Sequence, residues 1–377
     1  MSFPITGIGA VASIGASPDE IFTGLCEGRT GLGPLRGFDR ERFNAQQLFE
    51  IDDRSGDGDE PGRATRFLVE AVRQAAADAG LGEDLSGVPV LVGTGLRELR
   101  SLELWWRDGI PPGFDAAGLD FGPALQQRFG ALDTHTFANA CSASLYALAL
   151  GWDLLEQGDA ETVIVAGCDA VTESMFGQAD RVQFSPPPAV RPFDRERQGT
   201  ILGEGAAAVV LRRRPEAGRP VRGWLRSVAV NCDARHPTAP DREGITASVR
   251  QAHDIAGVTP EEIDLVLLHG TGTPVNDLME AQVTGDVFAG ARPALTGIKS
   301  QTGHTSGSAG LMSLLVALSS IETGTIPAIA GLADPLPEAA GLRLVRDTTV
   351  SETVRCAQVN GFGFGGVNAV AVVAGAA

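Results

Sequence analysis

The sequence is poor in lysine and in positive charge. Its 377 residues carry a formal net charge of −17, and Lys299 is the only lysine among the 30 lysine and arginine residues. A strongly acidic chain is a poor match for nucleic acid or for an anionic membrane surface. We therefore expect neither as a partner. The single lysine stands five residues before a histidine, which makes it a candidate site residue.

Cysteines are few and long apolar runs are absent. The five cysteines are odd in number and lack disulfide-framework and zinc-ligand spacing. This pattern favours free thiols, a reducing compartment and no bound metal. No run approaches the ~18–20 apolar residues that cross a bilayer. The first residues also lack the charged and apolar regions of a signal peptide, so we expect a soluble, cytoplasmic protein.

Segments with strand and helix periods alternate along the chain, which predicts an α/β protein with both sheet faces covered. A charged, turn-rich stretch near 212–220 is the best candidate boundary, and similar periods on its two sides suggest a duplication. Helices are expected at 18–28, 63–80, 142–155, 244–257, 278–287 and 308–323. Strands are expected at 88–94, 163–166, 206–211, 221–230, 263–268, 295–298, 356–359 and 367–374, and residues 5–12 form a short apolar run broken by glycines.

Cys141 stands in Ala-Cys-Ser-Ala-Ser, directly before the expected helix at 142–155. The positive end of a helix dipole beside the sulfur would lower the thiol pKa and favour a nucleophilic thiolate. From position alone, a small buried hydrophobic role is the stronger interpretation. The other four cysteines have no comparable surroundings and are interpreted as structural.

Two histidines have a similar setting to Cys141. His269 in His-Gly-Thr-Gly-Thr-Pro and His304 in Lys-Ser-Gln-Thr-Gly-His each follow a strand-like run and lie beside glycines. Such loops are too rich in glycine to serve packing, so both histidines are catalytic candidates. His135, His236 and His253 lie in other contexts, where surface or structural roles are expected.

With Cys141, His269 and His304 in these motifs, the chain resembles the β-ketoacyl-acyl carrier protein synthases, which are condensing enzymes of the thiolase superfamily. The resemblance extends over nearly the whole chain, in the same order. The segments that carry it are Ile-Thr-Gly-Ile-Gly at 5–9, Ala-Cys-Ser-Ala-Ser at 140–144, Arg-Pro-Phe-Asp-Arg-Glu-Arg-Gln-Gly at 191–199, Leu-Gly-Glu-Gly-Ala at 202–206, His-Gly-Thr-Gly-Thr-Pro at 269–274, Lys-Ser-Gln-Thr-Gly-His at 299–304 and Asn-Gly-Phe-Gly-Phe-Gly-Gly-Val-Asn at 360–368.

The resemblance implies a fold and a division of the chain. The fold is a thiolase-like duplicated α/β core with five layers, αβαβα, and mixed sheets. Residues 1–214 would form the N-terminal half with the nucleophilic cysteine. Residues 215–377 would form the C-terminal half with two catalytic histidines.

It also implies roles for individual residues. Cys141 would accept the acyl group, while His269 and His304 would bind the thioester carbonyl of the extender unit and stabilise the enolate. Lys299 and Glu280 match a buried ionic pair that supports the histidine loops.

Five further positions match parts of the family site. Phe364 corresponds to a gating residue, with Phe362 in the same motif, and the backbone N–H groups of Phe364 and Cys141 resemble an oxyanion hole. Thr271 and Thr273 match hydroxyls that bind the phosphopantetheine arm, although plain turn residues would look the same. Leu96 lies where family members limit acyl-chain length.

The expected reaction is a decarboxylative Claisen condensation of a Cys-bound acyl group with malonyl-acyl carrier protein, in a polyketide or specialised fatty-acid pathway. No cofactor is expected, because the carrier protein brings the phosphopantetheine arm. The expected partners are acyl carrier protein and a second subunit, in a homodimer or in a heterodimer with a related chain. Candidate carrier-binding arginines are Arg63, Arg66, Arg191, Arg195 and Arg197.

Two other functions stay open. One is a non-decarboxylating acyltransferase that moves the acyl group to an amine or alcohol. The other is a pocket-shaping partner subunit, although such subunits usually lack the nucleophile. The chain also departs from the family pattern: Ser313 replaces a frequent glutamate, and the segment between Gly95 and Cys141 is short, with Trp105-Trp106 and Pro111-Pro112. These departures leave acyl specificity open.

Overall fold

The computed structural model describes residues 1–54, 56, 58–110, 114–182 and 185–375, so Pro111-Pro112 lie outside the described residues. Within this part of the chain, ten strands form one mixed sheet in the order β10-β9-β13-β14-β8-β1-β7-β6-β4-β5. Their bounds are β1 (Phe3–Ala12), β4 (Val90–Gly93), β5 (Thr134–Phe137), β6 (Thr162–Asp169), β7 (Gly205–Arg212), β8 (Gly223–Cys232), β9 (Leu265–Leu267), β10 (Ala294–Thr296), β13 (Cys356–Gly363) and β14 (Val367–Ala374). Two short hairpins pair β2 (Gly33–Pro34) with β3 (Gln47–Leu48), and β11 (Thr325–Ile326) with β12 (Val350–Ser351).

The sheet consists of two halves with the same topology. In the first half β5, β4 and β6 are parallel, and β7 and β1 follow antiparallel. In the second half β10, β9 and β13 are parallel, and β14 and β8 follow antiparallel. Only Phe3–Ile5 of β1 pair with β8 to join the halves. The duplication expected from the sequence is therefore confirmed, and the proposed boundary at 214/215 lies between β7 and β8.

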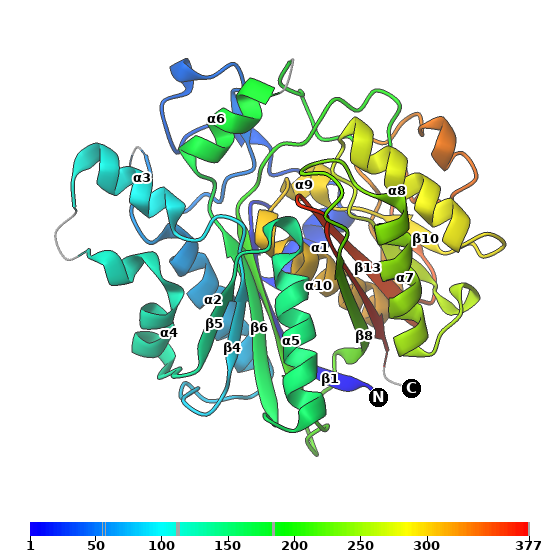
Figure 1. Ribbon diagram of the computed structural model, residues 1–377, viewed down its shortest axis with the longest axis horizontal. Helices are drawn as coiled ribbons and strands as arrows, with labels where there is room; N and C mark the ends of the chain where they lie inside the picture. Colours follow the sequence, from blue (N-terminus) through cyan, green and yellow to red (C-terminus); the bar gives the residue numbers. More distant parts are fainter. Residues whose placement is uncertain (55, 57, 111–113, 183–184, 376–377) are drawn as a thin grey trace.

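Helices complete five layers, as predicted (Figure 1). Helices α5 and α10 lie between the two half-sheets, and each contacts strands of both halves. Helix α2 covers the outer face of the first half, and α7 with α8 covers the second. The helices are α1 (Pro18–Cys26), α2 (Arg63–Asp78), α3 (Leu99–Asp108), α4 (Phe121–Phe129), α5 (Ala143–Gln157), α6 (Glu173–Val182), α7 (Arg242–Ala256), α8 (Pro274–Val287), α9 (Lys299–Thr302) and α10 (Ala309–Thr323).

The composition of each layer follows from its neighbours. Helix α10 is apolar on nearly all sides because the half-sheets cover it from two directions, whereas α2 has one apolar face directed at β1, β6 and β7. The Ile-Thr-Gly-Ile-Gly motif lies on β1, where a Cβ at Gly9 would be 2.1 Å from the carbonyl oxygen of Ala71. Glycine at this position therefore allows α2 to pack close to the sheet.

The structure adds elements that hydrophobic periodicity does not indicate. Helices α3, α4 and α6 and the edge strand β5 are polar on their exposed sides, so their sequence pattern is weak. The strand expected to reach Lys299 is shorter than predicted: β10 ends at Thr296, and Lys299 begins the short helix α9. Among the described residues, no helix has the length and apolar character needed to traverse a membrane.

Candidate active site

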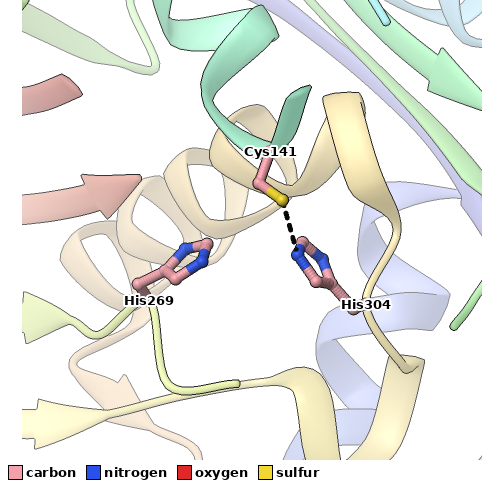
Figure 2. A group of neighbouring side chains, drawn as sticks. All are labelled: Cys141, His269 and His304. Atoms are coloured by element: carbon pink, nitrogen blue, oxygen red, sulfur yellow. Dashed lines mark hydrogen bonds between the residues drawn. The ribbon is translucent and has the colours of Figure 1, made fainter. Parts of the chain in front are cut away.

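Cys141, His269 and His304 meet at the carboxyl ends of the parallel strands. Cys141 lies in the 3-10 turn η3 (Ala140–Ser142) after β5, and His269 follows β9. His304 Nε2 is 3.0 Å from Cys141 Sγ, and the two imidazole centroids are 5.5 Å apart. The nearest ligand atoms of all three side chains lie within 4.8 Å of one another, and both rings turn toward the sulfur (Figure 2). The structure thus brings together the three residues that the sequence singles out.

Two equivalent turns connect the site to the N-termini of the two central helices, α5 and α10. Ala140 (φ 49°) and Ser306 (φ 50°) each stand three residues before the first residue of a central helix, α5 or α10. Ser306 opens the second turn, η5 (Ser306–Ser308). A left-handed conformation costs a non-glycine residue about 1–2 kcal/mol. The strained residue at each elbow reverses the chain, so that Cys141 projects from the helix N-terminus toward the histidines.

Burial of the sulfur reverses the expected pKa shift of Cys141. The loss of solvation raises the pKa of this thiol to about 11, and a nearby carboxylate, Asp169, also raises it. The charge of Lys299 and the backbone N–H groups of Phe364 and Cys141 act in the lowering direction but do not prevail. The expectation of a lowered thiol pKa is therefore wrong. The resting sulfur is a thiol in contact with His304.

Burial has the opposite effect on the two histidines, because it disfavours their charged form. It lowers the pKa of His269 and of His304 well below the ordinary value, and the neighbouring charge of Lys299 lowers both further. Both rings are therefore neutral at pH 7. A neutral imidazole offers one N–H donor and one acceptor nitrogen.

Comparison with known proteins places this geometry in a family. Residues 4–217 match the model of the beta-ketoacyl synthase N-terminal domain, and residues 222–333 match that of the C-terminal domain. The chain belongs to the β-ketoacyl synthase family. The resemblance inferred from the sequence motifs is thereby confirmed, and so is the thiolase-like fold class, because solved ketosynthases superpose on the whole chain.

Several relatives of this β-ketoacyl synthase span its full length. A 3-oxoacyl-[acyl-carrier-protein] synthase 2 of Synechocystis sp. is 30% identical over 97% of this chain and 95% of its own. The chloroplastic 3-oxoacyl-[acyl-carrier-protein] synthase I of Hordeum vulgare is 28% identical over 98% of this chain and 88% of its own. Among solved structures, the ishigamide ketosynthase/chain length factor shares 32% identity, with a TM-score of 0.91 over 100% of this chain and 99% of that one.

Lys299 and Glu280 are both buried, but they do not form the predicted ionic pair. No contact within 4.0 Å joins them among the ion pairs of the described residues. Instead, each side chain binds the backbone of His269. Glu280 Oε1 accepts the His269 N–H at 2.7 Å, and Lys299 Nζ donates to the His269 carbonyl oxygen. These two bonds hold the peptide groups on both sides of His269 and so fix the position from which its ring extends, without a salt bridge between Lys299 and Glu280.

Phe364 and Phe362 differ in position although they belong to one motif. The Phe364 side chain is 58% exposed on the loop between β13 and β14, while its backbone N–H binds the sulfur of Cys141. Phe362 is buried, with its ring 5.8 Å from that of His269. The backbone N–H groups of Phe364 and Cys141 both act on the sulfur, and their role as an oxyanion hole remains a prediction.

The predicted substrate-binding residues lie farther out. Thr271 and Thr273 hydroxyls are 2.9 Å apart, and Thr273 also caps α8 by accepting the Asn276 N–H, so turn-forming roles account for the contacts of both threonines. Leu96 is half-buried after β4, where its N–H donates to Asp169 at 2.7 Å. Ser313 is buried within α10. Binding roles for the threonines and Leu96 remain predictions.

Two buried aspartates at the site escaped the sequence analysis. Asp169 ends β6 and accepts N–H groups of Gly95, Leu96 and Gly307, so it ties the end of β4 to the elbow after His304. Burial raises its pKa to about 6. Asp277 accepts the Gly272 N–H and thereby holds the loop after His269. The only sequence signal for Asp277 is its position three residues before Glu280, on the same face of α8.

The Leu-Gly-Glu-Gly motif also supports His304, through the backbone. His304 N–H donates to the carbonyl oxygen of Ile201 at 2.9 Å, and the Gly203 N–H donates to the carbonyl of His304 at 3.0 Å. Glu204 in the same motif binds the guanidinium of Arg63 with both oxygens. Arg63 is 1% exposed, so its expected place on a carrier-binding surface is wrong. Arg66 and Arg195 are exposed, and Arg191 and Arg197 are half-buried.

The remaining histidines fit their expected roles; of the other cysteines, Cys168 and Cys356 are buried as expected, whereas Cys232 is exposed. His135 and His236 are exposed, and His253 is buried in α7. Cys141, His269 and His304 are the one group of the described residues whose donor atoms suit a soft metal ion such as Zn²⁺. A metal there would occupy the reactive sulfur. The expectation of no resident metal and no cofactor stays a prediction.

Proposed function

We propose that this β-ketoacyl synthase catalyses the decarboxylative condensation of an acyl group on Cys141 with malonyl-acyl carrier protein. The observation that carries the proposal is the meeting of one thiol with two neutral imidazoles beside two backbone N–H donors. Simple acyl transfer needs a nucleophile and one base. The second imidazole is the group that only an enolate step requires.

The first half-reaction forms the acyl-enzyme. Cys141 Sγ attacks the acyl thioester, and its proton passes to His304 Nε2, the ring nitrogen at 3.0 Å. The N–H groups of Cys141 and Phe364 stabilise the tetrahedral oxyanion. The carbon–sulfur bond of the incoming thioester then breaks, and the leaving pantetheine thiolate takes up the proton. A neutral His304 is suited to this step because one of its ring nitrogens carries no proton and can accept the proton of the thiol.

The second half-reaction forms the new carbon–carbon bond. The malonyl carboxylate leaves as carbon dioxide, and its bonding electrons form an enolate on the thioester. His269 donates the N–H that faces the substrate to the enolate oxygen, and His304 does the same after its single ring proton has moved from Nδ1 to Nε2 by exchange with water. The enolate carbon attacks the acyl carbonyl on Cys141, and the tetrahedral intermediate expels the cysteine thiolate. The thiolate takes up one proton from water, and the β-ketoacyl thioester leaves on the carrier.

Acyl carrier protein and a second ketosynthase-like subunit are the proposed partners. One similar structure is a type II polyketide synthase acyl carrier protein bound to its ketosynthase, at 20% identity and a TM-score of 0.89. The ishigamide structure combines a ketosynthase with a chain length factor. We further propose that no cofactor takes part beyond the carrier's phosphopantetheine arm. Five free cysteines, one of them the nucleophile, favour a reducing compartment such as the cytoplasm.

The test loads the protein with acyl carriers and measures each half-reaction separately. Intact-protein mass spectrometry reports acylation of Cys141, and trapped carbon dioxide reports decarboxylation of malonyl carrier. We expect His269→Ala to acylate normally and to lose decarboxylation by about 100-fold or more, because one oxyanion donor is typically worth ~2.7–4 kcal/mol. Cys141→Ala should not acylate.

Other outcomes would select another function. Acylation of the wild-type protein without any carbon dioxide would favour the acyltransferase. A Cys141 that never acylates would leave only a pocket-shaping subunit. A His269→Ala variant with wild-type decarboxylation would contradict the proposed role of the second imidazole.

A further inference from the structure

A chain of buried hydrogen bonds runs from helix α7 to the backbone of His269. His253 Nε2 lies 2.6 Å from Gln358 Oε1, and Gln358 Nε2 lies 2.7 Å from Asn360 Oδ1. Asn360 Nδ2 lies 2.9 Å from Glu280 Oε1, the oxygen that also accepts the His269 N–H. His253, Gln358, Asn360 and Glu280 are each less than 5% exposed. We call these four side chains the His253 relay.

The direction of every bond in the relay follows from its catalytic end. Backbone N–H groups only donate, so both Glu280 oxygens are acceptors, one for His269 and one for Gly270 at 2.8 Å. Asn360 must then present its NH₂ group to Glu280 and its oxygen to Gln358. Gln358 likewise presents NH₂ to Asn360 and its oxygen to His253. Among the described residues, the one donor in contact with this last oxygen is a protonated Nε2 of His253.

Strand β13 aligns the relay with the catalytic ring. Gln358, Asn360 and Phe362 alternate along the strand, so all three side chains leave the same face. The first two carry the relay, and Phe362 packs its ring against His269. The same face of the strand therefore supports the backbone of His269 through Glu280 and the side chain of His269 through Phe362.

We infer that His253 and Gln358 are positioning residues for the enolate step: they fix Asn360 and Glu280 in the one orientation that holds the His269 peptide. The inference rests on the proposed function only for the role assigned to His269. Without the His253 donor, Gln358 Oε1 is buried and unpaired, and burying an unpaired polar group is unfavourable. Turning the Gln358 amide over would place its oxygen against Asn360 Oδ1. Turning the Asn360 amide over as well would place Asn360 Oδ1 against the Glu280 carboxylate. The strain is thus transmitted to the loop that carries His269.

A matched pair of variants separates the donor from the packing of the ring. In the wild-type protein the His253 ring makes an edge-to-face contact with Phe288, with 5.7 Å between the ring centroids. His253→Phe removes the N–H and should keep this contact. His253→Gln loses the ring and keeps an N–H donor at a similar distance from the backbone. His135→Phe, at an exposed histidine, is the control for substitution as such.

The first readout is the ratio of the two half-reactions. We expect His253→Phe to lower carbon dioxide release about tenfold, within the ~100-fold range that a 1 Å misplacement of a catalytic group can cause. Cys141 acylation should stay within about twofold of wild type, because no relay residue contacts the sulfur. His253→Gln should recover most of the lost activity. Equal losses in both half-reactions, or no recovery by glutamine, would show a merely structural role.

The second readout does not depend on turnover. In protein labelled with ¹⁵N-histidine, the wild-type His253 signals should be those of the Nε2–H tautomer. His253→Phe should shift the ring signals of His269, whereas His135→Phe should leave them in place. Unmoved His269 signals, or the Nδ1–H tautomer at His253, would overturn the inference. A wild-type protein that releases no carbon dioxide but shows these shifts would instead overturn the proposed function and retain the relay.

Discussion

At the residue scale, Lys299 carries the charge that adjusts the reactive centre. Burial lowers the pKa of Lys299 to about 8, while Glu280 partly offsets this effect. The ammonium in turn lowers the pKa of Cys141 and of both histidines. The conspicuous single lysine of the sequence therefore has an electrostatic role beside its bond to the His269 carbonyl.

Replacing Lys299 by methionine should raise the pKa of Cys141 further, because the nearest positive charge is lost. The pH profile of iodoacetamide alkylation should then move to higher pH, with slower alkylation below pH 8. Above pH 8, where wild-type Lys299 has itself lost its proton, the difference between the two proteins should shrink. Lys299→Arg keeps the charge and serves as the control. A profile that moves to lower pH would refute the assigned role.

At the element scale, two elbows of the same shape carry non-equivalent chemistry. Cys141 and Gly307 occupy equivalent positions, two residues before the first residue of α5 and of α10. Cys141 places its side chain in the site. The equivalent Gly307 leaves no room for a side chain, because a Cβ there would lie 2.4 Å from the Cα of Thr94. Packing of one half against the other thus depends on a missing side chain.

A pair of glycine substitutions tests this packing. Gly307→Ala should lower the free energy of unfolding by about 1–3 kcal/mol, the usual cost of overpacking. Gly285→Ala, at an exposed position in the last turn of α8 with no atom within 4 Å of the new Cβ, should raise it by up to about 0.5–1 kcal/mol. Urea unfolding followed by circular dichroism measures both. Equal effects of the same sign would mean that the close contact at Gly307 is unimportant.

At the scale of the whole molecule, a net charge of −17 has to be reconciled with an acidic carrier protein. The segment around Arg195 is a candidate docking surface for the proposed carrier protein, although Arg195 is paired with Asp334 at 3.0 Å in the free protein. Arg197 donates to the carbonyl of Pro274, beside the loop of His269, and the neighbouring Arg195 side chain is 59% exposed. Positive charge at the mouth of the site can guide an acidic partner even when the total charge is negative.

Arg195→Glu should therefore raise KM for malonyl-acyl carrier protein by about threefold to tenfold and should leave KM for malonyl-pantetheine unchanged. Arg213→Glu is the matched control, because Arg213 follows β7 at the opposite end of the sheet from the site. Steady-state kinetics at two salt concentrations would show the effect weakening as salt screens the charge. Equal effects of the two variants would exclude a specific docking surface near Arg195.

Local sequence patterns are enough to predict the α/β class, the duplication and the three side chains of the candidate site. Apolar periodicity is local, and the glycine-flanked motifs around Cys141, His269 and His304 report local turns, so both can be read without coordinates. Elements with polar exposed sides, such as β5, lack that signal. The pKa shifts of the site and the contacts that support it follow only from the tertiary structure. The raised pKa of Cys141, the separate bonds of Lys299 and Glu280, and the relay from His253 all arise from desolvation and from contacts between distant segments, which no local pattern encodes.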